Sequence, residues 1–319
     1  MIKLEYLESV GENLSRPESV ICNKKGEIYV SDSRGGITCI YPDRSQKLFS
    51  AIESGKKKIH PNGIALQKDR SFLIADLNEE TGGVFQLDRN GQLKPFLEQV
   101  DGIDLPPTNF VIQDIQERTW ITVSTRTIPR TLGYRKEIKN GFIVMVDKKG
   151  AKVVADNLGF ANEVAIHPSG KWLYVNETFA KQLSRFEINN DGSLRKQEVV
   201  TTFDEGTFPD GIVFDSEGLA WITSIISNRI IRVAFNGEQE LMIEDAEADH
   251  IAEIETIFRE GRMGKTEIDR VKSKKLKNIS SLAFGGSDLK TGYIGSLLGE
   301  NVQRFSSPVA GHAPAHWNY

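Results

Sequence analysis

The chain has 319 residues, of which 39% are hydrophobic and 26% charged, a composition typical of a globular protein. A formal net charge of −4 and a pI near 5.9 argue against a nucleic-acid-binding protein. No apolar run reaches the ~20 residues that span a bilayer, and the N-terminal residues lack a secretory signal pattern. These features favour a cytoplasmic protein with no nucleic-acid or membrane partner.

The strand signals follow one another regularly along the chain. Residues 2–9 read as a strand that lies outside any repeat. Runs rich in β-branched and aromatic residues then occur at 26–32, 71–76, 118–124, 171–177, 219–224 and 291–296. In most cases a further alternating run follows, as at 35–42, 82–88, 141–147, 181–188 and 228–235. Because no amphipathic helix separates these runs, we expect an all-β protein rather than an α/β fold.

A repeated segment organises these strands. Each copy begins with Glu, Asn or Asp, continues through a short apolar run and a turn, and ends in a second strand. The first polar residues, called anchors below, are Glu18, Asn62, Asn109, Asn162, Asp210 and Asn278, spaced 44 to 53 residues apart except for a last interval of 68. Such repeats are typical of propeller blades. We predict a six-bladed β-propeller forming a single domain over residues 1–319, with the N-terminal strand closing the last blade.

Residues 239–277 depart from this pattern. They are charged, and their apolar residues, from Leu241 through Ile251 and Ile254 to Phe258, recur near helical spacing. We predict a charged, partly helical insertion that explains the long last interval. Two roles remain open: a segment lying on the propeller rim, or a lid or homo-oligomer contact near the central pocket.

The anchors also predict a site. The innermost strand of each blade lines the central channel, so the first five anchors should converge at one mouth of that channel. One Glu, one Asp and three Asn side chains form an oxygen-only set with a formal charge of −2. This set suits a hard divalent cation. Calcium is favoured, with zinc, manganese or magnesium as alternatives.

The motifs around these anchors carry a family resemblance. RPESV, HPNGIA, PTNFV, FANEVA and FPDGIVFDSEG together resemble the gluconolactonase / regucalcin (senescence marker protein) family of metal-dependent six-bladed propeller hydrolases. The resemblance implies that Glu18, Asn162 and Asp210 hold the metal and that Asn109 faces the substrate. It also implies an activity: hydrolysis of a sugar lactone, or a similar small-molecule lactone, by a metal-activated water.

Within this scheme we assign Asp210 as the catalytic general base, because it joins a titratable carboxylate to the PDG motif. We assign Asn109, Arg126, Asn62 and His60 to substrate binding, with Arg126 pairing a carboxylate or hydroxyls of the substrate.

Three features depart from the family pattern. Phe110 stands where Asp is common, Glu163 stands where Gly is usual, and the third blade continues WITVSTRTIPR where many relatives have an aromatic residue and Asp. All lie near the expected substrate pocket, so the reaction class is a firmer expectation than the substrate. The alternatives are another ester or phosphotriester hydrolase on the same metal site, or a non-catalytic calcium-binding propeller.

Overall fold

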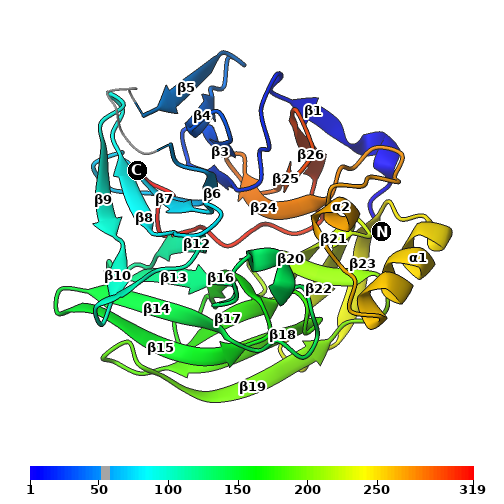
Figure 1. Ribbon diagram of the computed structural model, residues 1–319. Coiled ribbons are helices and arrows are strands. Elements are labelled where there is room, and N and C mark those ends of the chain that lie inside the picture. Colours follow the sequence, from blue (N-terminus) through cyan, green and yellow to red (C-terminus); the bar gives the residue numbers. More distant parts are fainter. Residues whose placement is uncertain (52–57) are drawn as a thin grey trace.

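The computed structural model describes residues 1–51 and 58–319. Six four-stranded antiparallel sheets form a ring around a central channel (Figure 1), which confirms the all-β six-bladed propeller. Each blade begins with its innermost strand, and each innermost strand contacts those of both neighbouring blades, which closes the ring. The innermost strands, in ring order, are β2, β6, β12, β16, β20 and β24.

The first three blades follow directly along the chain, with a two-stranded hairpin between the second and third. They comprise β2 (Val20–Cys22), β3 (Ile28–Asp32), β4 (Gly36–Ile40) and β5 (Gln46–Ser50); β6 (Pro61–Leu66), β7 (Phe72–Asp76), β8 (Val84–Leu87) and β9 (Leu93–Leu97); the hairpin β10 (Gln99–Val100) and β11 (Ile103–Asp104); and β12 (Thr108–Gln113), β13 (Thr119–Val123), β14 (Gly141–Asp147) and β15 (Gly150–Leu158). A short 3₁₀ helix, η2 (Arg130–Gly133), lies in the loop between β13 and β14.

The remaining blades complete the ring and include the N-terminal strand. They comprise β16 (Ala161–Ile166), β17 (Trp172–Glu177), β18 (Gln182–Ile188) and β19 (Leu194–Thr202); β20 (Thr207–Phe214), β21 (Ala220–Ile226), β22 (Arg229–Val233) and β23 (Gln239–Glu244); and β24 (Ile279–Gly285), β25 (Thr291–Ser296), β26 (Val302–Ser306) and β1 (Glu8–Val10). The 3₁₀ helix η1 (Leu4–Tyr6) precedes β1. β1 pairs antiparallel with β26, with Val10 opposite Val302, so the outermost strand of the last blade comes from the start of the chain.

Four innermost strands, β6, β12, β16 and β20, share an irregularity where their anchors lie. The pairing register shifts between Pro61 and Ile64 in β6, and an equivalent shift occurs at the start of β12, β16 and β20. Such bulges re-aim a side chain relative to the sheet. Gly63 and Gly211 follow two anchors, and a Cβ on either would meet the backbone of the next innermost strand at 2.5 or 2.4 Å. The glycines of the Asn62–Gly63 and Asp210–Gly211 pairs therefore allow neighbouring innermost strands to pack closely.

The C-terminal segment crosses the end of the channel opposite the anchors. Its backbone bonds to the fifth blade, where the His312 amide donates to the Phe214 carbonyl, and then to the first, where the Lys24 amide donates to the Trp317 carbonyl. In Figure 1 this red segment runs across the ring to the C-terminus. It lines that end of the channel.

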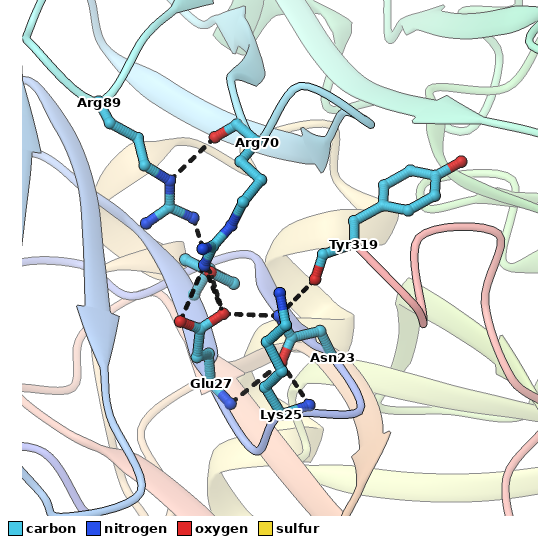
Figure 2. A network of polar contacts seen from close by, with 7 residues as sticks. Asn23, Lys25, Glu27, Arg70, Arg89 and Tyr319 are labelled. Carbon is cyan, nitrogen blue, oxygen red and sulfur yellow. Dashed lines mark hydrogen bonds and ion pairs between the residues drawn. The ribbon is translucent and has the colours of Figure 1, made fainter.

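A polar network holds the last residue in place (Figure 2). The Asn23 side chain donates to the Tyr319 carbonyl at 3.2 Å and to Glu27 Oε2 at 2.7 Å. Arg70 Nη2 donates to both oxygens of Glu27, at 2.9 Å each, and the Arg89 guanidinium donates to the Arg70 carbonyl. The network joins the first and second blades to the chain terminus.

The predicted insertion is present and partly helical. Its first residues form β23, the fourth strand of the fifth blade, so Leu241 belongs to a strand and the inserted segment proper follows Glu244. The helices are α1 (Ala248–Arg259), which buries Ile251, Ile254 and Phe258, and the short α2 (Lys265–Ile268). Among the described residues, no helix has the length and apolar character needed to cross a membrane.

Candidate active site

Five anchors lie at the start of five neighbouring innermost strands. Glu18 precedes β2. Asn62, Asn109 and Asn162 are the second residues of β6, β12 and β16, and Asp210 is the fourth residue of β20. All are buried: the exposed fractions are 7% for Glu18, 2% for Asn62, 1% for Asn109, 6% for Asn162 and 3% for Asp210. The sixth anchor, Asn278, instead joins β21 to the insertion, since it accepts from the Ile226 amide and donates to the Ile268 carbonyl.

Hydrogen bonds connect the amide anchors around the mouth. Arg16 Nη1 donates to Asn62 Oδ1 at 3.2 Å. Asn62 Nδ2 donates to the Asn109 carbonyl at 2.8 Å, and Asn109 Nδ2 donates to Asn162 Oδ1 at 2.5 Å. The three Asn side chains therefore form one continuous chain that spans three blades.

A second layer of polar groups fixes Asn162 and Asp210 relative to each other. Thr178 Oγ1 accepts from Asn162 Nδ2 at 3.0 Å and donates to the Pro209 carbonyl at 2.8 Å. The Asn176 amide donates to the backbone carbonyl of Asp210 at 2.9 Å. These contacts hold the strand start that carries Asp210 against the fourth blade.

The carboxylates of this site lie close enough to repel one another. The pKa of Asp210 is raised well above its usual range, mainly by burial and next by the neighbouring Glu18 carboxylate. The pKa of Glu163 is raised in the same way, mainly by burial and next by the Asp210 carboxylate. Glu163 Oε2 accepts from the Ile212 amide at 3.0 Å, and its side chain faces the channel below the anchors.

These residues fit a hard divalent cation. Glu18 Oε2 is buried and has no hydrogen-bond partner, although Arg16 Nη2 lies 2.7 Å from it as an ion pair. The buried carboxylates of Glu18 and Asp210 repel each other, and Asn162 lies in the same network. Together these three side chains form an oxygen donor set of the kind that Ca²⁺ prefers. Within the described part of the chain, no group of three or more His, Cys, Asp or Glu side chains is arranged as a metal site. The donor set of Glu18, Asn162 and Asp210 has only two carboxylates and relies on an amide oxygen for its third ligand.

Two of the residues assigned to substrate binding lie apart from this network. Arg126 is exposed, pairs with Asp156 at 2.7 Å and stacks on the Phe142 ring at 4.1 Å. His60 is half-buried next to Asn62, and its backbone amide donates to Asp76 Oδ1 at 2.8 Å. Neither residue has a side-chain contact with the anchors among the hydrogen bonds of the described residues.

Two arginines that the sequence did not single out do contact the anchors. Arg16 binds Glu18 and Asn62, as described above. Arg130, from η2, donates to Asn109 Oδ1 at 2.8 Å and to Ser124 Oγ at 3.1 Å. Arg16 is the first residue of the RPESV motif that contains Glu18, so its contact could have been expected from proximity. Arg130 lies 21 residues from Asn109 in a loop, so no local pattern indicates its contact.

The insertion flanks the same mouth. Phe258 of α1 packs against Phe208, two residues before Asp210, with ring centroids 5.2 Å apart, and against Phe179 at 5.9 Å. Tyr134, next to η2, stacks on Phe179 at 4.7 Å. Arg135 Nη1 donates to the Met263 carbonyl at 2.6 Å. The insertion therefore supports the loop that carries Arg130.

At the other end of the ring, the channel contains a cavity of about 240 Å³. Its walls are mostly apolar side chains of the innermost strands, including Ile64, Phe110 and Ile212. His312 and His316 of the C-terminal segment line its far end. These two histidines lie on the opposite side of the ring from the anchors, so they are not part of the anchor cluster.

The fold and this site together define a class: a six-bladed β-propeller with a buried oxygen-donor cluster at one mouth of its channel. The chain belongs to the SMP-30/gluconolactonase/LRE-like family, whose model matches residues 16–255. This match confirms the family resemblance and includes all five anchors of the cluster.

Known proteins with similar sequences or structures agree with this placement. The 6-deoxy-6-sulfogluconolactonase of Pseudomonas putida is 27% identical over 235 residues, which cover 72% of this chain and 67% of that protein. A gluconolactonase structure from Xanthomonas campestris superposes with a TM-score of 0.69 at 16% identity, covering 95% of this chain and 89% of that one. The calcium-binding protein regucalcin from Agrobacterium tumefaciens superposes with a TM-score of 0.68 at 16% identity, covering 97% and 95%. At these identities the structural similarities concern the fold alone.

Proposed function

We propose that this protein is a divalent-cation-dependent hydrolase that opens a sugar lactone or a similar lactone. The observation that carries the proposal is the burial of Glu18, Asn162 and Asp210 in one network at a propeller mouth, in a chain whose family includes gluconolactonases. Relatives named for gluconolactone and its sulfonated derivative support a sugar lactone as the substrate.

Glu18, Asn162 and Asp210 would hold the cation, and calcium is the favoured ion because all three donors are oxygens and a structural neighbour is named as calcium-binding. When bound, the cation supplies polarisation of the lactone carbonyl and lowers the pKa of a water molecule. The Asn109 side-chain amide donates to Asn162 and accepts from Arg130, and it is placed to orient an oxygen of the substrate.

The proton transfers are assigned to Asp210. Hydrolysis adds water to the carbonyl carbon, breaks the ring C–O bond and leaves a hydroxy acid. A carboxylate oxygen of Asp210 accepts the proton that the attacking water loses, and the same proton then neutralises the departing ring oxygen. In the cation-free protein, burial and the Glu18 carboxylate raise the pKa of Asp210 above its usual range, and a bound cation would oppose this shift.

The substitution Asp210→Asn tests this assignment. General-base catalysis contributes about 100-fold or more to a rate, so we expect kcat for glucono-δ-lactone, above the spontaneous rate, to fall by at least that factor. Asp204→Asn is the matched control, because Asp204 is exposed and lies just before the same strand. Lactone opening that is unchanged in Asp210→Asn would remove Asp210 from the mechanism.

One alternative has support from a specific observation. A structural neighbour is named as a calcium-binding protein, so the cluster could serve calcium binding without catalysis. In that case calorimetry would detect calcium binding that depends on Glu18, while no lactone would be opened above the spontaneous rate with any cation.

A further inference from the structure

Arg130 is a half-buried arginine that lies beside the anchors. Its guanidinium donates to Asn109 Oδ1 at 2.8 Å, to Ser124 Oγ at 3.1 Å and to the Tyr134 hydroxyl at 3.2 Å. It lies over the Phe160 ring at 4.6 Å. Every one of these groups is electrically neutral, so the half-buried cation has hydrogen bonds but no counter-ion from them.

The remaining described residues do not supply that counter-ion. Across residues 1–51 and 58–319, no carboxylate lies within ion-pair distance of Arg130, and its Nε is buried without a hydrogen-bond partner. Asp210 attracts it only from beyond that distance. A guanidinium stays protonated in proteins, and a half-buried charge is costly unless it is paired, so a bound anion in direct contact with Arg130 would stabilise this part of the mouth.

Arg16 provides a second positive charge on the other side of the Asn62–Asn109 pair. Its backbone lies in the left-handed region, at a φ of 51°, a conformation that is unfavourable for a non-glycine residue and often found at functional sites. Its side chain is 35% exposed and contacts both Glu18 and Asn62. It therefore reaches the anchors while remaining accessible from solvent.

Without a cation, the formal charges of the two proposed carboxylate ligands, Glu18 and Asp210, equal and oppose those of Arg16 and Arg130. The buried Glu163 carboxyl group lies next to Asp210. A divalent cation held by the two carboxylates would neutralise them and leave the two arginines without an opposing charge. The cation-loaded mouth would then attract anions in addition to the lactone carbonyl.

We propose that Arg130, assisted by Arg16, forms an anion subsite, and that the substrate is a lactone that carries a second, negatively charged group such as a phosphate, sulfonate or carboxylate. The inference rests on the proposed function, which it narrows to anionic sugar lactones. A planar guanidinium with donors directed to one side suits an oxyanion. Arg130 would thus determine specificity, while Asp210 and the cation site would carry the reaction.

The rival explanation is that Arg130 only positions the Asn109 amide. The two roles make different predictions. A positioning role affects neutral and anionic ligands equally, whereas an anion subsite affects only the ligand that carries the extra charge. A comparison of two ligands that differ in one charged group therefore separates them.

The test measures binding of 6-phosphogluconate and gluconate by calorimetry to the calcium-loaded protein. We expect the wild type to bind 6-phosphogluconate about tenfold tighter, as one charge-assisted contact allows. In Arg130→Gln the two affinities should agree within about twofold, while Arg130→Lys should retain part of the preference. Arg195→Gln, the control, removes an exposed arginine of the outer strand β19 and should keep the full preference.

Two results would overturn the subsite. One is equal affinity of the wild type for both ligands, and the other is an unchanged preference in a folded Arg130→Gln protein. Lactone assays keep this outcome separate from the proposed function. Cation-dependent lactone opening without any preference for the phosphorylated ligand would remove the subsite alone. A preference that depends on Arg130, in a protein that opens no lactone, would remove the hydrolase proposal alone.

Discussion

The position directly after each anchor is filled differently from blade to blade. Gly63 and Gly211 occupy it where the next innermost strand approaches too closely for a Cβ. Glu163 occupies it in the fourth blade and reaches across to the Ile212 amide. A carboxyl group thus bridges two blades directly beneath the proposed cation site, where a glycine would leave the amide without this partner.

Glu163 should make the stability of the cation-free protein depend on pH. Because its pKa in the folded state is raised above the ordinary value of 4.5, the folded protein holds this proton more tightly than the unfolded chain. The stability that Glu163 contributes is complete below about pH 4.5 and is lost as the pH rises toward the raised pKa. Glu163→Gln should abolish this loss, which has a slope of at most about 1.4 kcal/mol per pH unit.

Urea unfolding with a chelator present, at several pH values between about 5 and 8, measures the effect. The free energy of unfolding of Glu163→Gln should rise relative to that of the wild type as the pH increases. Glu253→Gln is the control, since Glu253 is an exposed residue of α1. A difference between Glu163→Gln and wild type that does not vary with pH would show that Glu163 is already ionised.

The sequence predicts the anchors but not their arginine partners. Glu18, Asn62, Asn109, Asn162 and Asp210 could be placed together because each occupies the same position of a repeat, and the fold brings those positions to one mouth. No comparable rule applies to Arg130, whose place depends on a loop, nor to Arg126, which the structure pairs with Asp156.

At the level of elements, α1 is attached to the propeller through its apolar side chains and also through one buried acidic residue. Glu255 Oε1 lies 2.6 Å from Lys181 Nζ and accepts from the Gly206 amide at 2.6 Å. The pair is largely buried, with side-chain exposures of 14% for Lys181 and 5% for Glu255. It joins the insertion to the loops of the fourth and fifth blades that border the mouth.

Glu255→Ala should therefore be strongly destabilising. Removal of one member of a buried ion pair leaves the other charge unpaired and costs about 3–5 kcal/mol. Glu253→Ala in the same helix removes an exposed pair with Arg270 and should cost less than about 1 kcal/mol. Urea unfolding of both variants checks the contrast, and similar free energies of unfolding would contradict the anchoring role of Glu255.

The helical part of the insertion could be predicted because its apolar residues recur at helical spacing, and α1 does bury Ile251, Ile254 and Phe258. Its starting point could not be placed so well. The apolar residues of β23 continue the same charged sequence, and Leu241 and Met242 fit a strand as well as a helix. Only pairing with β22 assigns them to the fifth blade.

For the whole molecule, the last blade depends on β1 for its outermost strand. This strand comes from the start of the chain and completes the blade formed by the end of the repeat region. Without it, β26 would become an exposed edge strand, and such edges favour aggregation.

Deletion of residues 1–10 should therefore lower the melting temperature and promote aggregation. Glu8→Ala serves as the control, because it removes only the exposed ion pair with Arg304 and should cost less than about 1 kcal/mol. Thermal unfolding followed by light scattering measures both effects. A deletion variant that is as stable and as soluble as the Glu8→Ala variant would show that the last blade does not depend on β1.

The architecture followed from the sequence because repeated strands of similar spacing leave few arrangements open. The C-terminal segment could not be placed in the same way, since it matches no repeat. Its crossing of the channel depends on single backbone contacts with the fifth and first blades and on the network around Asn23 and Tyr319.

A cation titration of lactone opening tests the proposed hydrolase most directly. Chelator-treated wild type is assayed with glucono-δ-lactone and its phosphorylated analogue while Ca²⁺, Mn²⁺, Zn²⁺ or Mg²⁺ is added. We expect no rate above the spontaneous one without a cation, and a saturable rate when at least one of these ions is restored. A full rate in the presence of chelator, or no rate with any of the ions, would contradict a cation-dependent lactonase.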